Sequence, residues 1–290
     1  MNARCLVALA MWVAVAPLYA ADPVIDGVQM PAWIERGGVR MPAAPGVSLK
    51  TQDRLVTGQN ARLLLRMPEG SLVKLGENGT LSLNALSASG RGTEQLVNAT
   101  LEVFKGAFRF TTQALSGYRG RRAVDIKVAT VTAGIRGTDV WGKSDDARDL
   151  VCLIEGKVAV THGSDQPVTL DSPLDFYVAP KVGAPQKAKV DQRQLDQWAL
   201  ETEIAPAQGA ARRGGRWKVY AASADSQSDA LGVYDRLRNA GYAATIATRK
   251  TDSGIGYRVV IGQLPSEQEA RALAERLKTQ LGVAEPTVSR

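Results

Sequence analysis

The chain has 290 residues, about twice the size of one ordinary folding unit, so two domains are expected. Its hydrophobic fraction of 44% and charged fraction of 22% are ordinary for folded proteins and exclude global disorder. The formal net charge of +7 favours an anionic partner. If the chain is exported, that partner is an envelope polymer or lipid headgroup, and we expect no nucleic acid.

The first 21 residues have the layout of a secretory signal peptide. A positive Arg4 precedes an apolar run over residues 5–16, Pro17 breaks the run, and the small residues Ala20 and Ala21 follow. The run is shorter than the roughly 18 apolar residues that cross a bilayer, so we expect cleavage near Ala20 or Ala21. No later stretch is apolar enough to span a membrane, so the mature chain is expected to have no transmembrane helix.

The region up to residue 182 has few helical signals. Residues 22–45 are rich in Pro, Gly and Ala and are expected to form an extended leader with little regular structure. Residues 46–182 contain short alternating apolar runs separated by Gly, Asn and Ser. Two of these runs, 100–104 and 107–111, are separated by a predicted turn at Gly106. The pattern predicts an all-β domain, either a sandwich, a barrel or a short β-solenoid.

A connecting segment and a second domain follow. Residues 183–215 are expected to hold a short amphipathic helix and then a flexible linker of small residues. Residues 216–290 show the order β-α-β-β-α-β, and Ser266 with Glu269 has the capping-box spacing at the start of the second helix. This order predicts a four-stranded antiparallel sheet with both helices on one face and the other face free.

The free face of this sheet is the candidate binding surface. On the first and third strands, Val219, Val259 and Ile261 suit the side that the helices cover. The alternate positions present aromatic and polar groups, which are the groups needed to bind sugar rings and their hydroxyls. We therefore predict glycan-binding residues at Lys218, Tyr220, Arg258 and Val260, with Ser223 at the strand end as a further donor.

Residues 216 to about 288 resemble the sporulation-related repeat, or SPOR domain. The resemblance is carried by residues 217–223 (WKVYAAS), by Gly241-Tyr242 and by residues 256–264 (GYRVVIGQL). It implies a ferredoxin-like or RNP-like βαββαβ fold. It also implies binding to peptidoglycan glycan strands stripped of their stem peptides, usually at the division site. The opening strand departs from the family pattern at Tyr220 and Ala222.

Residues 46 to about 180 resemble a FecR-type domain. The resemblance rests on residues 68–76 (PEGSLVKLG), 130–138 (TVTAGIRGT) and 153–158 (LIEGKV). It implies an all-β envelope domain of a Gram-negative bacterium, and so a periplasmic location for the chain. Arg136 lies between glycines in the central motif, and we expect it to pair with a carboxylate or carbonyl groups at a tight turn.

Catalytic chemistry has little support in the sequence. His162 is the only histidine, and Cys152 is the only cysteine beyond the predicted signal peptide, so we expect no cofactor, metal site or catalytic residue. The favoured hypothesis is a non-enzymatic periplasmic protein that binds peptidoglycan glycan strands through its C-terminal domain and another envelope component, such as an envelope protein, through its β domain. The alternatives are an envelope sensory or regulatory protein whose FecR-like domain relays a signal by protein contacts, and an unrecognised wall hydrolase.

Overall fold

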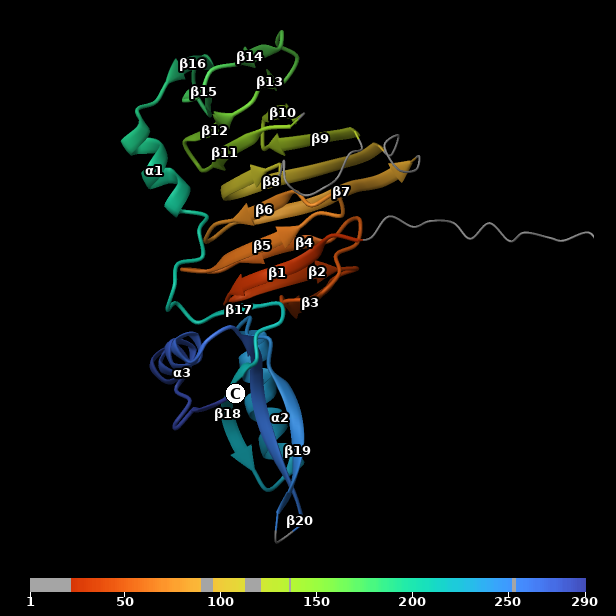
Figure 1. The fold of residues 1–290 in the computed structure, drawn as a ribbon, viewed down its shortest axis with the longest axis vertical. Helices are drawn as coiled ribbons and strands as arrows, with labels where there is room; N and C mark the ends of the chain where they lie inside the picture. Colours follow the sequence, from red (N-terminus) through yellow and green to blue (C-terminus); the bar gives the residue numbers. More distant parts are fainter. Residues whose placement is uncertain (1–21, 90–95, 113–120, 136, 252–253) are drawn as a thin grey trace, which may run out of the picture.

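The structure is a computed structural model that describes residues 22–290 apart from 90–95, 113–120, 136 and 252–253. Within these residues it has 21 strands and three helices. Residues 24–212 form an elongated β body, and residues 217–289 form a small α+β unit at one end of it (Figure 1). The predicted combination of an all-β domain and a small α+β domain is confirmed. The predicted signal peptide, residues 1–21, and Arg136 lie outside the described residues.

The β body consists of two layers that share the long strand β8 (Leu96–Thr111), and we call it the sandwich. Sheet A follows the order β17 (Ala210–Arg212), β1 (Val24–Gln29), β5 (Arg62–Arg66), β6 (Leu72–Leu75), β8, β11 (Asp139–Ser144), β12 (Arg148–Glu155), β15 (Asp175–Pro180) and β16 (Gln186–Lys189). Sheet B follows the order β3 (Val39–Pro42), β2 (Ala32–Arg36), β4 (Arg54–Thr57), β7 (Thr80–Ser89), β8, β9 (Arg121–Val128), β10 (Val131–Ile135), β13 (Val158–His162) and β14 (Val168–Leu170). We call the end at β17 and β3 the proximal end, and the end at β16 and β14 the distal end.

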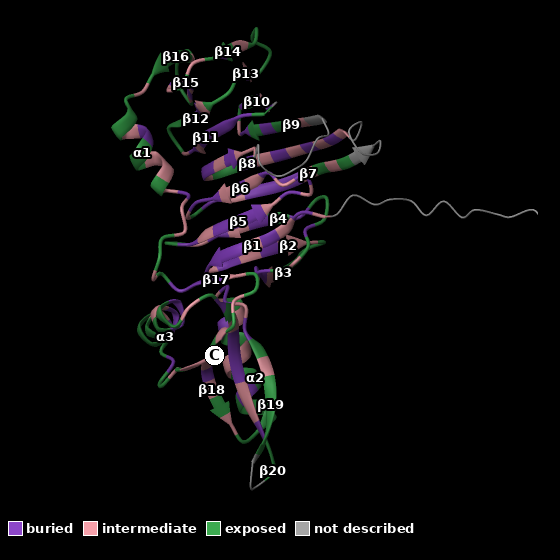
Figure 2. Cartoon of the chain, viewed as in Figure 1, coloured by how far each residue is buried: buried purple, intermediate pink, exposed green. Residues whose placement is uncertain are grey.

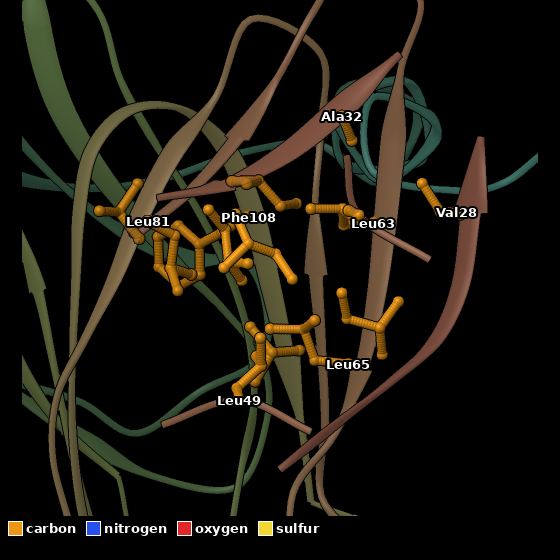
Figure 3. Packing of buried hydrophobic residues seen from close by; sticks show 14 of the residues in the cluster. Val28, Ala32, Leu49, Leu63, Leu65, Leu81 and Phe108 are labelled. Atoms are coloured by element: carbon orange, nitrogen blue, oxygen red, sulfur yellow. The ribbon is translucent and has the colours of Figure 1, made fainter. Parts of the chain in front are cut away.

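The core lies between the two sheets and follows from period-two alternation. In β5, Leu63 and Leu65 are buried in the core shared with sheet B, whose Leu81 packs in the same cluster. Phe108 from the second half of β8 is fully buried beside them (Figure 3). Burying each such side chain stabilises the fold by about 1.5–3 kcal/mol. Figure 2 shows the buried residues running along the length of the sandwich.

The expectation of an extended leader over residues 22–45 is wrong. These residues form β1, β2 and β3, and their Ile25, Val28 and Ile34 are fully buried in the core. The strands are short and are separated by Pro and Gly, so no long alternation marks them in the sequence. β1 is held by long-range pairing, with β5 on one side and β17 on the other, while β2 pairs with β3 and β4.

The predicted turn at Gly106 is also wrong. Instead, β8 continues through this position as one strand and passes from sheet B to sheet A. Gly106 has φ +89°, and a Cβ there would lie 2.6 Å from Gly79 Cα. Glycine is needed here for two reasons: the backbone has a left-handed conformation, and a side chain would collide with the backbone of Gly79.

Residues 191–213, which we call the return segment, run back along sheet A to its proximal end. The predicted short helix is present as α1 (Gln192–Leu200), capped by the Asp191 side chain, which accepts a hydrogen bond from the Gln194 N–H. Its Trp198 stacks on Trp141 of sheet A at 5.0 Å between ring centroids. Figure 1 shows α1 alongside β11, β12 and β15.

The rest of the return segment is bound to the sandwich, so the expectation of a flexible linker is wrong. Lys143 on sheet A pairs with Glu201 at 2.8 Å, and Glu203 pairs with Lys74 and Arg109. Beyond these ion pairs, β17 adds a strand to the edge of β1. Ala210 and Ala211 in β17 are buried. The small residues in this stretch therefore allow the backbone to pack closely against the sandwich.

The C-terminal unit has the predicted βαββαβ order. Its sheet follows the order β19 (Thr245–Thr251), β20 (Gly254–Leu264), β18 (Trp217–Ala224) and β21 (Thr287–Ser289). The helices are α2 (Gln227–Asn239) and α3 (Glu267–Leu281). Ser226 and Ser266 cap their N-termini, and Gly282 ends α3 with φ +62°. Both helices pack on one face through residues such as Leu237 and Leu273.

The C-terminal unit covers the proximal end of the sandwich. Glu269 of α3 is nearly buried and accepts hydrogen bonds from the N–H groups of Ala207 at 2.7 Å and Ala210 at 2.9 Å. The Ser266 side chain caps α3 as predicted, but the second half of the capping box is replaced by these contacts with the return segment. Arg276 donates to the Met30 carbonyl oxygen at 2.9 Å. The two units are therefore joined by hydrogen bonds as well as by the chain.

The distal end carries an acid whose protonation is expected to lower stability. Asp175 of β15 is buried and lies 3.1 Å from both Lys187 and Lys189. Desolvation alone would raise the pKa of Asp175, but hydrogen bonds from the two lysines and from the backbone N–H groups of Ser172 and Asp171 outweigh it and lower the pKa to about 2.

Because the folded pKa of Asp175 lies below the unfolded value of about 3.9, its contribution to stability is present above pH 4. It is lost as the pH falls from about 4 towards 2. Urea unfolding of the wild type and of Asp175→Asn at pH 6, 4 and 2.5 measures this, and the wild type should lose more free energy of unfolding over that range. Parallel pH profiles for the two proteins would contradict the assignment.

Candidate functional site

The pairing of β18 with β20 defines the two faces of the C-terminal sheet. Residues directly opposite each other on antiparallel strands point to the same face. Val219 pairs with Ile261, and both are buried on the helix-covered side. Tyr220 pairs with Val260, which places both on the other face, called here the open face. These positions agree with the alternation expected from the sequence.

A β-bulge between Tyr220 and Ala222 changes the face of the next residues on β18. Strict alternation places Ala222 on the face of Tyr220. In the structure, Ala222 pairs with Val259 and packs against the core, while Ser223 pairs with Arg258 and is exposed. The bulge thus brings Ser223 into the open face beside Arg258. Sequence alternation alone does not show this insertion.

The predicted residues gather around one stacked pair. The guanidinium carbon of Arg258 lies 4.8 Å from the centroid of the Tyr220 ring, and both side chains are partly exposed. Val260 lies on the same face but is only 7% exposed, so it supports its neighbours and offers little surface. Lys218 is exposed beside Gly262, where a Cβ would lie 3.9 Å from Lys218 Cγ.

Strand β19 adds residues that the sequence reasoning missed. Thr245 pairs with Val260, and Ala247 pairs with Arg258, so both belong to the open face. Arg249 lies two residues further along and is exposed. Their position depends on the register between β19 and β20. Figure 2 shows β19 as largely exposed, and its alternation of Thr245, Ala247 and Arg249 was the local signal in the sequence.

The junction with the sandwich leaves the open face uncovered by the described residues. The junction uses Glu269 and Arg276 on α3 and the loop after α2, where the Gly241 carbonyl oxygen accepts a hydrogen bond from the Ala32 N–H at 3.1 Å. No hydrogen bond or ion pair joins Tyr220 or Arg258 to the sandwich in the described part of the chain. A ligand therefore has access to the stacked pair.

Cys152 and His162, the other two reactive side chains considered in the sequence analysis, lie in the FecR-like part of the chain. Burial raises the pKa of the Cys152 thiol to about 12, so the thiol stays protonated. His162 lies 3.3 Å from Asp165 at the turn after β13. Across the described ranges, we find no group of three or more His, Cys, Asp or Glu placed to hold a metal ion. Within the same ranges, the helices are too short or too polar to cross a membrane.

Two family models match separate segments of the chain, one in the sandwich and one that includes the C-terminal unit. The family model described as "FecR protein" matches residues 53–159, and the model described as "SPOR domain" matches residues 214–289. No curated protein matches this sequence. SPOR and FecR domains are, as families, binding or regulatory domains.

Two crystal structures of a candidate anti-sigma factor from Parabacteroides distasonis ATCC 8503, at 1.65 and 2.50 Å resolution, are similar to this chain. They share 14% and 13% identity with TM-scores of 0.39 and 0.40, and each comparison covers 70% of this chain and 96% of the other.

The family matches confirm the two resemblances in the predicted order. The chain therefore carries a FecR domain followed by a C-terminal SPOR domain.

Proposed function

We propose that this chain is a non-enzymatic periplasmic protein that binds peptidoglycan glycan strands through the open face of its SPOR domain. The observation that carries the proposal is the stack of Arg258 on Tyr220, beside Ser223, on a sheet face that the helices leave free. An aromatic ring gives apolar surface for a sugar ring, and the guanidinium and hydroxyl groups supply hydrogen bonds to sugar oxygens. The proposed location follows from the SPOR domain and from the signal-peptide pattern of residues 1–21.

The test is retention of the full-length mature protein on purified sacculi, with and without amidase treatment to remove stem peptides. The wild type should be retained on the treated sacculi. Replacing both Tyr220 and Arg258 with alanine should weaken retention about tenfold or more, which corresponds to about 1.4 kcal/mol of binding free energy. Soluble muropeptides released by the protein are measured in the same assay, and their release would show that the chain is a wall hydrolase.

The chain offers a matched control for this double variant. Arg238 lies over the Tyr234 ring at 5.1 Å on α2, on the other side of the sheet. The double variant Tyr234→Ala, Arg238→Ala removes the same two residue types and should keep wild-type retention. Melting temperatures of both variants show whether they are folded. If the control loses retention as strongly as the open-face variant while folded, the site is elsewhere.

For the FecR domain, we propose that the outer face of sheet B contacts another envelope component. The outer face of sheet A is occupied, because α1 and the return segment bind to it. On sheet B, Phe104 remains 43% exposed with Arg54 over its ring at 5.1 Å. A photo-crosslinker at Lys127 on this face should capture a partner in cells, whereas one at Gln186 on β16 should not. Equal capture at both positions would contradict this assignment.

A further inference from the structure

The open face of the SPOR domain carries charge of one sign. Three basic residues lie on it, namely Lys218, Arg249 and Arg258. None of the three forms an ion pair with another described residue. The remaining open-face positions on the four strands are uncharged: Tyr220, Ser223, Thr245, Ala247, Gly256, Val260, Gly262, Thr287 and Ser289.

The acidic residues of the same domain lie elsewhere. Those in the described part of the domain are on α2, on α3 or in loops: Asp225, Asp229, Asp235, Glu267, Glu269, Glu275 and Glu285. The described open face thus carries only basic residues, whereas the helix side carries both acidic and basic residues. A cationic surface whose described residues include no carboxylate creates a positive potential that attracts anionic ligands.

The outer face of sheet B shows what a solvated sheet face looks like in the same molecule. There, Glu35 lies 3.7 Å from Arg40 and 3.9 Å from Arg54, so opposite charges alternate across neighbouring strands. Further along the sheet, Lys127 lies 2.9 Å from Glu102. A sheet face can therefore be exposed to solvent with paired charges of both signs, so exposure alone does not explain why the described open face carries only basic residues.

Within the open face, Arg258 is the cation best placed to select a ligand. Its guanidinium is positioned by the Tyr220 ring below it, so less side-chain freedom is lost on binding than for a free arginine. Its planar N–H groups match the two oxygens of a carboxylate. Ser223 is its neighbour across the strands and offers one hydroxyl donor beside it.

We propose that Arg258 recognises free carboxylates carried on the sugar rings of the glycan, and this rests on the proposed function above. In peptidoglycan, every second sugar bears a lactyl group whose carboxyl is amide-linked to the stem peptide. Removing the peptide leaves a carboxylate close to the ring. A stripped strand is therefore a regularly spaced polyanion, complementary to the positive open face. Charge at the ring, in addition to the absence of a bulky peptide, would make stripped strands the preferred ligand.

The experiment compares three preparations with the full-length mature protein: intact sacculi, amidase-stripped sacculi, and stripped sacculi whose carboxylates have been converted to neutral amides with carbodiimide and ammonia. The wild type should bind the stripped preparation more tightly than the amidated one, by about tenfold or more, because a charged hydrogen-bonded contact is lost on amidation; tenfold corresponds to about 1.4 kcal/mol. This difference should shrink as salt increases.

Two variants assign the difference to one residue. Arg258→Gln should lose most of the preference for the stripped over the amidated preparation, and only the smaller contribution of Lys218 and Arg249 should remain. Arg271→Gln removes the same charge from α3, where Arg271 is 74% exposed and pairs with Glu267, and it should keep the wild-type preference. Equal wild-type binding to stripped and amidated sacculi would overturn the carboxylate proposal and leave glycan binding standing. Absence of binding to all three preparations would overturn the proposed function itself.

Discussion

Replacing Asp149 with alanine is expected to lower the free energy of unfolding by about 1–3 kcal/mol, because it removes the buried acceptor of hydrogen bonds from two hydroxyl groups and the partner of the half-buried Lys181. The Asp149 carboxylate is fully buried on β12 and lies 2.6 Å from Lys181 Nζ. It also accepts hydrogen bonds from the hydroxyls of Ser144 at 2.7 Å and Thr130 at 2.6 Å. Desolvation opposes its ionisation, but these partners outweigh it and hold the pKa of Asp149 below its ordinary value.

Two further variants separate charge from hydrogen bonding at this position. Asp149→Asn keeps an oxygen that can accept from Ser144 and Thr130, so we expect a smaller loss than with alanine. Lys181→Met leaves the buried carboxylate without its cation, although the two hydroxyl donors remain. Urea unfolding at pH 7 measures all three. A loss below about 1 kcal/mol for Asp149→Ala would mean that water replaces the carboxylate without penalty.

Replacing Gly241 with alanine is expected to lower the free energy of unfolding by about 2–5 kcal/mol and to weaken the junction between the two domains. Gly241 has φ +84°, and a left-handed conformation costs a residue with a Cβ about 1–2 kcal/mol. The new Cβ would also lie 2.6 Å from the Trp33 ring and 2.9 Å from Pro31, and such overpacking costs about 1–3 kcal/mol more. The indole is rigid, so the clash forces the loop away from the sandwich.

Gly282 provides the control for backbone strain. It ends α3 with φ +62°, and no heavy atom lies within 4 Å of its ideal Cβ position. Gly282→Ala therefore introduces the strain without the clash. Thermal unfolding and protease sensitivity of residues 205–215 report on the junction, and Gly241→Ala should be affected more by both measures. If the two variants behave alike, the contact with Trp33 does not hold the domains together.

The C-terminal domain was predictable because its signals are local. Ser266 caps a helix that ends at Gly282, and strands and helices of ordinary length follow each other without interruption. The face of each strand followed from alternation, as with Val219 and Ile261. What the sequence did not show was the bulge that moves Ser223 to the open face, because a bulge depends on the partner strand.

The proximal end of the sandwich was not predictable for a different physical reason. Strands β1 to β3 are short, and the partners of β1, which are β5 and β17, lie far away in the sequence. The same holds for the return segment, where Glu269 from the other domain fixes the N–H groups of Ala207 and Ala210. A composition of small residues suits a flexible linker and a closely packed strand equally well. Tertiary contacts decide between them.

The late position of β17 in the chain has a consequence for folding kinetics. Strand β1 is near the start of the folded region, yet Val28 finds its partner Ala211 only after the whole sandwich has been traversed. Contacts between such distant residues form slowly, because closing a long loop is entropically unfavourable. Until then, β1 is an unpaired edge that can recruit other chains. The protein is thus expected to be prone to aggregation until β17 has paired with β1.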